Sequence, residues 1–178
     1  MPRLFTALEL PAGIAFSLSL LRGGLSGARW IGPENYHITL RFIGDIDERT
    51  ADEVADALIR VDRPKFDIAL NGLAVFGSRK PHSLFAGATM SPSLRELQGE
   101  HERIMQRIGL EPERRKFTPH VTLARLKGAS ELAVATYLAL RGDFRTAPFP
   151  VGRFVLLSSK ASTGGGPYIM EEAYPLAA

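Results

Sequence analysis

The sequence carries the same short pattern twice, a histidine followed two residues later by threonine and then by leucine. One copy begins at His37 and reads His-Ile-Thr-Leu, and the other begins at His120 and reads His-Val-Thr-Leu. With four histidines and nine threonines in 178 residues, chance alone predicts about 0.2 His-x-Thr pairs in the chain. Two copies that also agree at the intervening and following apolar positions therefore indicate an internal duplication, displaced by 83 residues.

Each motif lies in a segment where polar and apolar residues alternate, residues 36–44 and 117–126, and this period of two predicts β-strands. The histidine and threonine of a motif then point to the same face of their strand. Arg41 keeps the phase of His37, so we expect it on that face, where it can contact a bound anion. Phe42 has the phase of the apolar positions and is predicted to pack in the core.

The order of predicted elements also occurs twice: strand, helix, His-bearing strand, helix and strand, in residues 3–76 and 83–174. No segment between the repeats has the composition of a linker, so we predict a single domain over residues 1–178 with two similar lobes. Hairpin-connected strands among helices favour an α+β fold in which each lobe has an antiparallel sheet and flanking helices. If a pseudo-twofold axis relates the lobes, the two His-x-Thr strands face a central groove.

Capping signals locate the helices. Asp47, Ser91 and Ser130 each precede a helical pattern and are predicted N-caps. A Gly-rich loop at 162–167 separates the last two strands. The predicted helices are residues 12–22, 48–61, 92–108 and 131–140, and the predicted strands are residues 3–10, 36–44, 66–76, 83–89, 117–126, 149–158 and 168–174.

Composition narrows the chemistry and the environment. The absence of cysteine excludes disulfides, cysteine nucleophiles and cysteine-ligated metals, which leaves the four histidines as the side chains that titrate near neutral pH. The longest apolar run near the start, residues 14–21, contains two serines and is far shorter than the ~20 residues of a membrane span. The first residues also lack the pattern of a signal peptide. We therefore expect a cytoplasmic protein with no membrane partner.

Two histidines and two threonines that face one groove suit a bound phosphate. One imidazole can take a proton from water while the other gives a proton to the leaving oxygen, as ester displacement at phosphorus requires near neutral pH. The hydroxyls of Thr39 and Thr122 can donate to the non-bridging oxygens, where charge accumulates in the transition state. This design requires no metal or other cofactor.

Further segments match a known family. Residues 3–11, 37–44 and 115–125, with Gly-Pro-Tyr at 166–168, together resemble the two-histidine phosphoesterases, and among these the bacterial and archaeal RNA 2′,3′-cyclic phosphodiesterases, historically called 2′-5′ RNA ligases. The resemblance covers nearly the whole chain. It implies a bilobal α+β fold and metal-independent hydrolysis of RNA 2′,3′-cyclic phosphate ends to 2′-phosphates, with reversible 2′-5′ ligation of RNA ends as a side activity.

The resemblance also implies roles for the motif residues. His37 and His120 would be the acid–base pair, while Thr39 and Thr122 would hold phosphate oxygens. We assign His120 to activate water and His37 to protonate the departing O3′, but the near symmetry of the motifs leaves the opposite order open. The implied partners are RNA ends that carry a 2′,3′-cyclic phosphate, tRNA fragments among them, with a small cyclic nucleotide as an alternative substrate. Because the duplication supplies both sides of the groove from one chain, a monomer is expected.

Three further residues are candidate substrate contacts. Arg125 matches a family arginine that holds phosphate, but strand alternation places it on the opposite face from His120, so this role requires a β-bulge or the end of the strand. Arg41 is the second candidate cation, and Tyr168 is a candidate for the rim of the groove. The basic run at 114–116 is a candidate for contacting an RNA backbone.

Two other interpretations of the motif remain open. The first is a non-catalytic RNA-binding module that holds phosphorylated RNA ends without turnover. The second is a metal-dependent hydrolase with the histidines as ligands, which the paired threonines disfavour because they replace a third histidine or a carboxylate. The remaining histidines have ordinary explanations, since His101 lies in the apolar face of a predicted helix and His82 lies at a turn.

Overall fold

The computed structural model describes residues 3–159 and 166–178, so most of the predicted loop at 162–167 lies outside the described residues. The strands are β1 (Arg3–Glu9), β2 (Ala28–Trp30), β3 (His37–Asp45), β4 (Phe66–Ile68), β5 (Leu70–Phe76), β6 (Ser83–Ala88), β7 (His120–Leu126), β8 (Phe149–Val151), β9 (Arg153–Ser159) and β10 (Tyr168–Pro175). The helices are α1 (Ala12–Ser19), the 3-10 helix η1 (Pro33–Asn35), α2 (Glu48–Leu58), α3 (Pro92–Ile108) and α4 (Glu131–Arg141).

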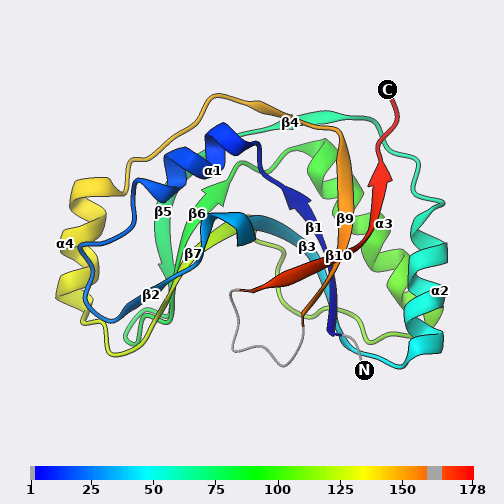
Figure 1. Ribbon diagram of the computed structural model, residues 1–178, viewed down its shortest axis with the longest axis horizontal. Helices are drawn as coiled ribbons and strands as arrows, with labels where there is room; N and C mark the ends of the chain where they lie inside the picture. The colour runs from blue at the N-terminus through cyan, green and yellow to red at the C-terminus, as the bar shows by residue number, and fades with distance from the viewer. Residues whose placement is uncertain (1–2, 160–165) are drawn as a thin grey trace.

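The main sheet joins eight strands, all of whose pairings are antiparallel, in the order β10-β9-β1-β3-β7-β6-β5, with β2 added beside β7. Helices α2 and α3 lie beside one lobe and α1 and α4 beside the other (Figure 1). The α+β fold with antiparallel sheets is therefore confirmed. None of the described helices is long and apolar enough to cross a membrane.

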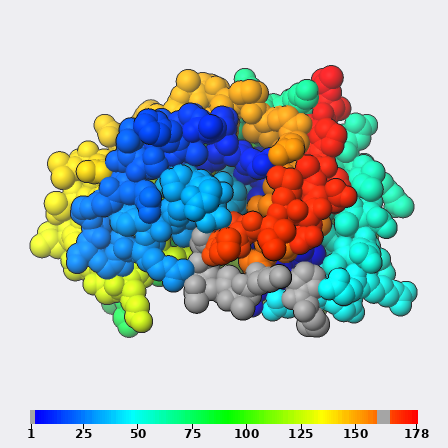
Figure 2. Space-filling view, in the orientation of Figure 1, coloured from blue at the N-terminus to red at the C-terminus, as the bar shows by residue number. Residues whose placement is uncertain are grey.

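The two lobes do not coincide with the two halves of the sequence. The lobe that contains β3 combines the first strand, β1, with the last two, β9 and β10, whereas the other lobe is built from β2, β5, β6 and β7. Figure 2 shows this on the surface, where the red C-terminal residues and the cyan residues of α2 share one end and the yellow residues of α4 form the other. The internal duplication stays a prediction, and each of the two predicted repeats contributes strands to both lobes.

The structure divides two of the predicted strands. The expected strand at 66–76 is split into β4 and β5, and the one at 149–158 into β8 and β9. The short pieces β4 and β8 pair with each other in a separate two-stranded sheet, and the chain then crosses to the main sheet. Strand pairing over such a sequence separation leaves no trace in local alternation, so the sequence could not indicate the division.

The predicted N-caps are confirmed. The carboxylate of Asp47 accepts from the Thr50 amide at 2.7 Å, and the hydroxyl of Ser91 accepts from the Leu94 amide at 3.2 Å. Ser130 caps α4 in the same way. Each cap satisfies an amide that the first turn of a helix leaves unpaired, which fixes where α2, α3 and α4 begin.

A β-bulge follows the His-x-Thr pair in both motif strands. In β3, Thr39 and Arg41 pair with adjacent residues of β1, so Leu40 is the extra residue. In β7, Thr122 and Ala124 pair with adjacent residues of β6, so Leu123 is the extra residue. A bulge reverses the alternation beyond it, so the side chains after each bulge change faces relative to the motif.

His101 packs in the core, as its place in the apolar face of α3 predicts. Its ring is fully buried against Phe154, and the Nδ1 atom shares a 2.8 Å hydrogen bond with the hydroxyl of Thr6 on β1. Burial lowers the pKa of His101 to about 3, so the ring is neutral in the folded protein at neutral pH.

This buried histidine should make the fold sensitive to acid. The unfolded chain protonates His101 near pH 6.5, whereas the folded protein does so only near pH 3. The contribution of neutral His101 to the free energy of unfolding is therefore complete above pH 6.5 and is lost progressively as the pH falls from 6.5 toward 3. His101→Gln keeps a polar partner for Thr6 without titrating. Between pH 7 and pH 5, the free energy of unfolding measured in urea should fall by about 2 kcal/mol less in the variant than in the wild type. Equal decreases in the two proteins would contradict the prediction.

Candidate active site

A cavity of about 1060 Å³ lies between the lobes and is lined by the histidine and threonine of both motifs. Strands β3 and β7 meet there at one residue pair, Ile38 with Val121, whose side chains are fully buried on the far face. Because the strands are antiparallel, this register sets the histidine of each motif opposite the threonine of the other. The four polar groups of the two motifs therefore share one surface of the groove.

The backbone orients the ring of His37. Its Nδ1–H donates to the Asn35 carbonyl at 2.9 Å, at the end of η1 where the chain enters β3. The Thr39 hydroxyl lies 2.9 Å from the other ring nitrogen, Nε2. With Nδ1 carrying the hydrogen, Nε2 accepts from the Thr39 hydroxyl in the neutral ring and is the nitrogen available for proton transfer.

His120 is held in the same manner. Its Nδ1–H donates to the Thr118 carbonyl at 2.6 Å, again the carbonyl two residues earlier in the chain. The two motifs thus fix the same tautomer by the same local contact, with Nε2 as the nitrogen that exchanges protons. No sequence signal marks these acceptors, because every residue has a backbone carbonyl.

Aromatic rings enclose each histidine on its own lobe. Phe5 and Tyr168 lie 5.0 and 5.1 Å from the His37 ring, measured between centroids. The ring of His120 is enclosed by two phenylalanines of β5 and β6, at 5.0 and 5.1 Å. Tyr168 lines the cavity at the place expected for the rim, whereas sequence reasoning did not find the phenylalanines.

The surroundings weaken the affinity of both histidines for protons. The pKa of His37 is lowered to about 4, mainly by burial and also by the charges of His120 and Arg125, while the hydrogen bond to the Asn35 carbonyl acts in the opposite direction. Burial also lowers the pKa of His120, again with a contribution from Arg125. Both rings are therefore neutral at pH 7 in the free protein, and an anion bound beside them would raise both pKa values.

The bulge in β7 brings Arg125 to the groove. Strand alternation alone would place it opposite His120, but the extra residue Leu123 returns it to the face of the motif, and its exposed side chain lines the cavity. The bulge that a phosphate contact by Arg125 requires is therefore present. Exposed His82 also borders the cavity and faces the Phe76 ring at 6.4 Å, a position that its turn sequence did not reveal.

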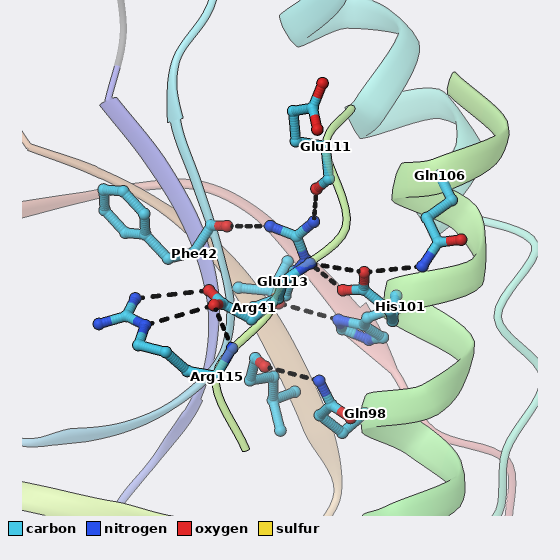
Figure 3. Close-up of polar contacts among 11 residues, drawn as sticks. Arg41, Phe42, Gln98, His101, Gln106, Glu111, Glu113 and Arg115 are labelled. Carbon is cyan, nitrogen blue, oxygen red and sulfur yellow. Dashed lines mark hydrogen bonds and ion pairs between the residues drawn. The ribbon is translucent and has the colours of Figure 1, made fainter. Parts of the chain in front are cut away.

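The matching bulge in β3 overturns the predicted positions of Arg41 and Phe42. Arg41 does not keep the phase of His37: it still borders the cavity, but it turns toward α3 and is only 6% exposed, with its guanidinium engaged by protein groups (Figure 3). Phe42 is not in the core but 44% exposed and on the cavity wall. The bulge that was considered for the second motif occurs in both.

The second motif is also approached by a basic segment. Arg115 and Lys116 line the cavity ahead of β7, and Arg115 forms an ion pair with Glu113 at 3.3 Å. Among residues 3–159 and 166–178, no three side chains of His, Cys, Asp or Glu are grouped in a way that could hold a metal ion. The arrangement as described is thus a pair of neutral imidazoles, two hydroxyls and a cluster of cations around a groove.

Comparison with known proteins agrees with this geometry. A sequence model of the LigT-like phosphoesterases matches residues 8–85 and 88–168. The chain belongs to this family. A relative from Aeropyrum pernix named RNA 2′,3′-cyclic phosphodiesterase is 38% identical over 138 residues, which cover 76% of this chain and 78% of the relative. One of the same name from Aquifex aeolicus is 34% identical over 155 residues, or 82% and 81% of the two chains.

The fold of the LigT-like chain also matches solved structures. The crystal structure of E. coli LigT complexed with 3′-AMP superposes with a TM-score of 0.80 at 24% identity, covering all of both chains. At this identity the likeness concerns the fold. The family model and the two named relatives confirm the resemblance to two-histidine phosphoesterases noted in the sequence.

Titration of the two groove histidines can be followed by NMR of the ring carbons and nitrogens. We expect a midpoint of about 4 for His37 and one below 6.5 for His120, with Nδ1 protonated in both neutral rings. Replacing Arg125 with alanine should raise both midpoints, because a neighbouring positive charge is removed. A midpoint at or above 6.5 for His37 would contradict the described burial.

Proposed function

We propose that this LigT-like phosphoesterase hydrolyses RNA 2′,3′-cyclic phosphate ends to 2′-phosphates by acid–base catalysis between His37 and His120. The observation that carries the proposal is the matched pair of imidazoles, each oriented by a backbone carbonyl and each placed opposite a threonine of the other motif. The name of the Aeropyrum pernix relative supports the same substrate. Because one chain supplies both lobes, a monomer would be sufficient.

In the proposed step, Nε2 of neutral His120 takes a proton from water as the water oxygen bonds to phosphorus. The bond from phosphorus to O3′ breaks, and O3′ receives the proton of Nε2 on charged His37. The phosphate stays on O2′. After turnover His120 is charged and His37 neutral, and exchange with solvent restores the starting state.

The groove is symmetric in its motifs but not in the positions five residues after each histidine. Arg125 occupies this position in β7 and suits non-bridging phosphate oxygens, whereas Phe42 occupies it in β3 and offers an exposed ring for stacking on a base. The ribose lies next to the base, so the departing O3′ would lie on the side of Phe42. This supports His37 as the acid and His120 as the base.

Thr39 and Thr122 would donate to the non-bridging oxygens. In the free protein the Thr39 hydroxyl lies 2.9 Å from Nε2 of His37. Once His37 binds a proton, Nε2 no longer accepts from this hydroxyl, which is then available to the phosphate. Protonation of His37 would therefore also free the Thr39 hydroxyl to donate to the phosphate.

Ligation would use the same groups. If the 5′-hydroxyl of a second RNA end replaces water, the same displacement of O3′ leaves a 2′-5′ linkage, and its reversal reforms the cyclic phosphate. We propose RNA fragments with cyclic phosphate ends, including tRNA halves, as the substrates. Tyr168 on the rim and the basic segment at 114–116 would contact the RNA next to its end.

The direct test uses a short RNA that ends in a 2′,3′-cyclic phosphate, in the presence of EDTA. We expect conversion to the 2′-phosphate, and a decrease in rate of about 10² to 10⁴-fold in His37→Ala and in His120→Ala, because each variant loses one proton transfer. Product analysis by chromatography gives the readout. Full activity of either variant would refute the mechanism, loss of activity in EDTA would favour a metal-dependent hydrolase, and salt-dependent binding without product would favour an RNA-binding module.

A second prediction concerns Arg125. Arg125→Ala should lower kcat/KM about 10- to 100-fold, because a charge-assisted contact to phosphate is lost. Lys127→Ala is the matched control, since this exposed cation lies two residues further along the chain and not on the cavity wall. Equal effects of the two substitutions in steady-state kinetics would show that only overall charge matters at this end of the groove.

A further inference from the structure

The segment that leads into the second motif has neither helix nor strand from residue 110 to residue 119, yet it forms part of the groove. Its Thr118 carbonyl accepts the hydrogen bond from Nδ1 of His120. The direction of the His120 ring therefore depends on where this irregular segment is held. Backbone hydrogen bonds hold the two ends of the segment, from the Leu110 amide to the Met105 carbonyl and from the Ala88 amide to the Pro119 carbonyl, and leave residues 111–118 between them.

Two side chains from elsewhere in the fold anchor the segment (Figure 3). Nη2 of Arg41 donates to the Glu111 carbonyl at 2.6 Å, and a carboxylate oxygen of Glu102, on α3, accepts from the Glu113 amide at 3.0 Å. Across the described residues, and apart from the bond with His120, the hydrogen bonds that residues 111–118 make with the rest of the chain end on these two side chains.

The two anchors also bind each other. Nε of Arg41 donates to the second carboxylate oxygen of Glu102 at 2.5 Å, and its Nη1 donates to the Phe42 carbonyl at 2.5 Å, directly after the bulge in β3. One buried guanidinium therefore connects the strand of the first motif, helix α3 and the segment before the second motif. The link runs from the lobe of His37 to the carbonyl that orients His120.

The same link places a cation at the groove. Glu113, whose amide is held by Glu102, accepts through its own carboxylate from the amide of Arg115 at 3.0 Å and from the Arg115 guanidinium at 3.3 and 3.4 Å. Arg115 is exposed on the cavity wall. The position of this cation is thus set through two carboxylates and not by the strand itself.

The equivalent position of the other motif shows that the fold does not require a charge here. The matching bulge of β7 puts Ala124 in the place that Arg41 takes in β3, and both side chains are buried. A guanidinium taken out of water is unfavourable unless its donors are satisfied, and small apolar packing serves the second lobe. The charge at Arg41 is therefore explained by what it binds, the segment before β7.

We propose that Arg41, together with Glu102, is a positioning residue: it holds segment 111–118 so that the Thr118 carbonyl orients His120 and Arg115 stands at the groove. Arg41 borders the cavity, but its guanidinium is engaged by Glu102 and by the Phe42 and Glu111 carbonyls, so it acts through these groups. The effect on turnover rests on the proposed function, but the effect on the His120 ring does not.

The test compares two ion pairs of α3. The double variant Arg41→Met/Glu102→Met removes the proposed link without leaving a buried charge unpaired, and Arg63→Met/Glu100→Met removes a second pair that joins the same helix to the chain after α2. Thermal unfolding establishes that both variants are folded. If the first does not fold, Arg41→Lys replaces it, because one ammonium nitrogen can keep the pairing with Glu102 but cannot also occupy the positions of the nitrogens that bind the Phe42 and Glu111 carbonyls.

The first readout is the NMR titration of the two histidines. The bond to Thr118 raises the pKa of His120, so its loss should lower the His120 midpoint and mix the tautomers of the ring, while the His37 midpoint stays at its wild-type value. The control pair should leave both rings unchanged. A His120 titration identical to wild type, or equal shifts of both histidines, would overturn the proposal in favour of a structural ion pair.

The second readout is cleavage of the cyclic phosphate RNA. In the first double variant we expect kcat/KM to fall about tenfold or more, because catalysis is sensitive to small displacements of the reacting groups. Misorientation of the His120 ring should reduce kcat, and displacement of Arg115 should raise KM. The control pair should retain wild-type values, and a decrease equal to that of the first variant would count against a specific link. If the wild type cleaves no cyclic phosphate, the proposed function fails, and the His120 titration still decides the role of Arg41.

Discussion

The groove depends on one backbone junction, the antiparallel pairing of Ile38 with Val121. Each of these residues directly follows a histidine, so the junction brings the two motifs together and sets each histidine opposite the threonine of the other. Their buried side chains fill the far face of the sheet, which directs the polar groups to the groove. The proposed chemistry, which needs two proton carriers at one phosphate, would thus depend on a single strand-to-strand contact between the lobes.

Much of this arrangement follows from local sequence, and the failures have one physical cause. Alternation predicted the motif strands, and capping signals predicted where α2, α3 and α4 begin. Alternation failed at Arg41 and Phe42 because a bulge inserts one residue and reverses every side chain beyond it. The signal that could have corrected this was the alignment of the two motifs, since a bulge invoked for Arg125 implies one at the equivalent Phe42.

The two halves of the site resemble each other in backbone and differ in side chains. The same carbonyl contact and the same bulge occur in both motifs, yet Phe42 corresponds to Arg125, and Arg41 corresponds to Ala124. The shared backbone geometry orients the two imidazoles in the same way, and the differing residues make the two sides of the groove chemically distinct. Which strands form each lobe was beyond the sequence, because pairing between β1 and β9 joins residues over 140 positions apart.

The exchange of strands between the lobes affects the order in which a growing chain can assemble them. A ribosome that has released residues up to about 142 has delivered the main-sheet strands and the helices of the lobe that carries His120. The lobe of His37 then still lacks β9 and β10, half of its sheet, and Tyr168, which packs against the His37 ring. The groove is therefore completed only once β9 and β10 have been synthesised, and a nascent chain that has reached residue 142 carries both groove histidines but lacks the strands and the tyrosine that enclose His37.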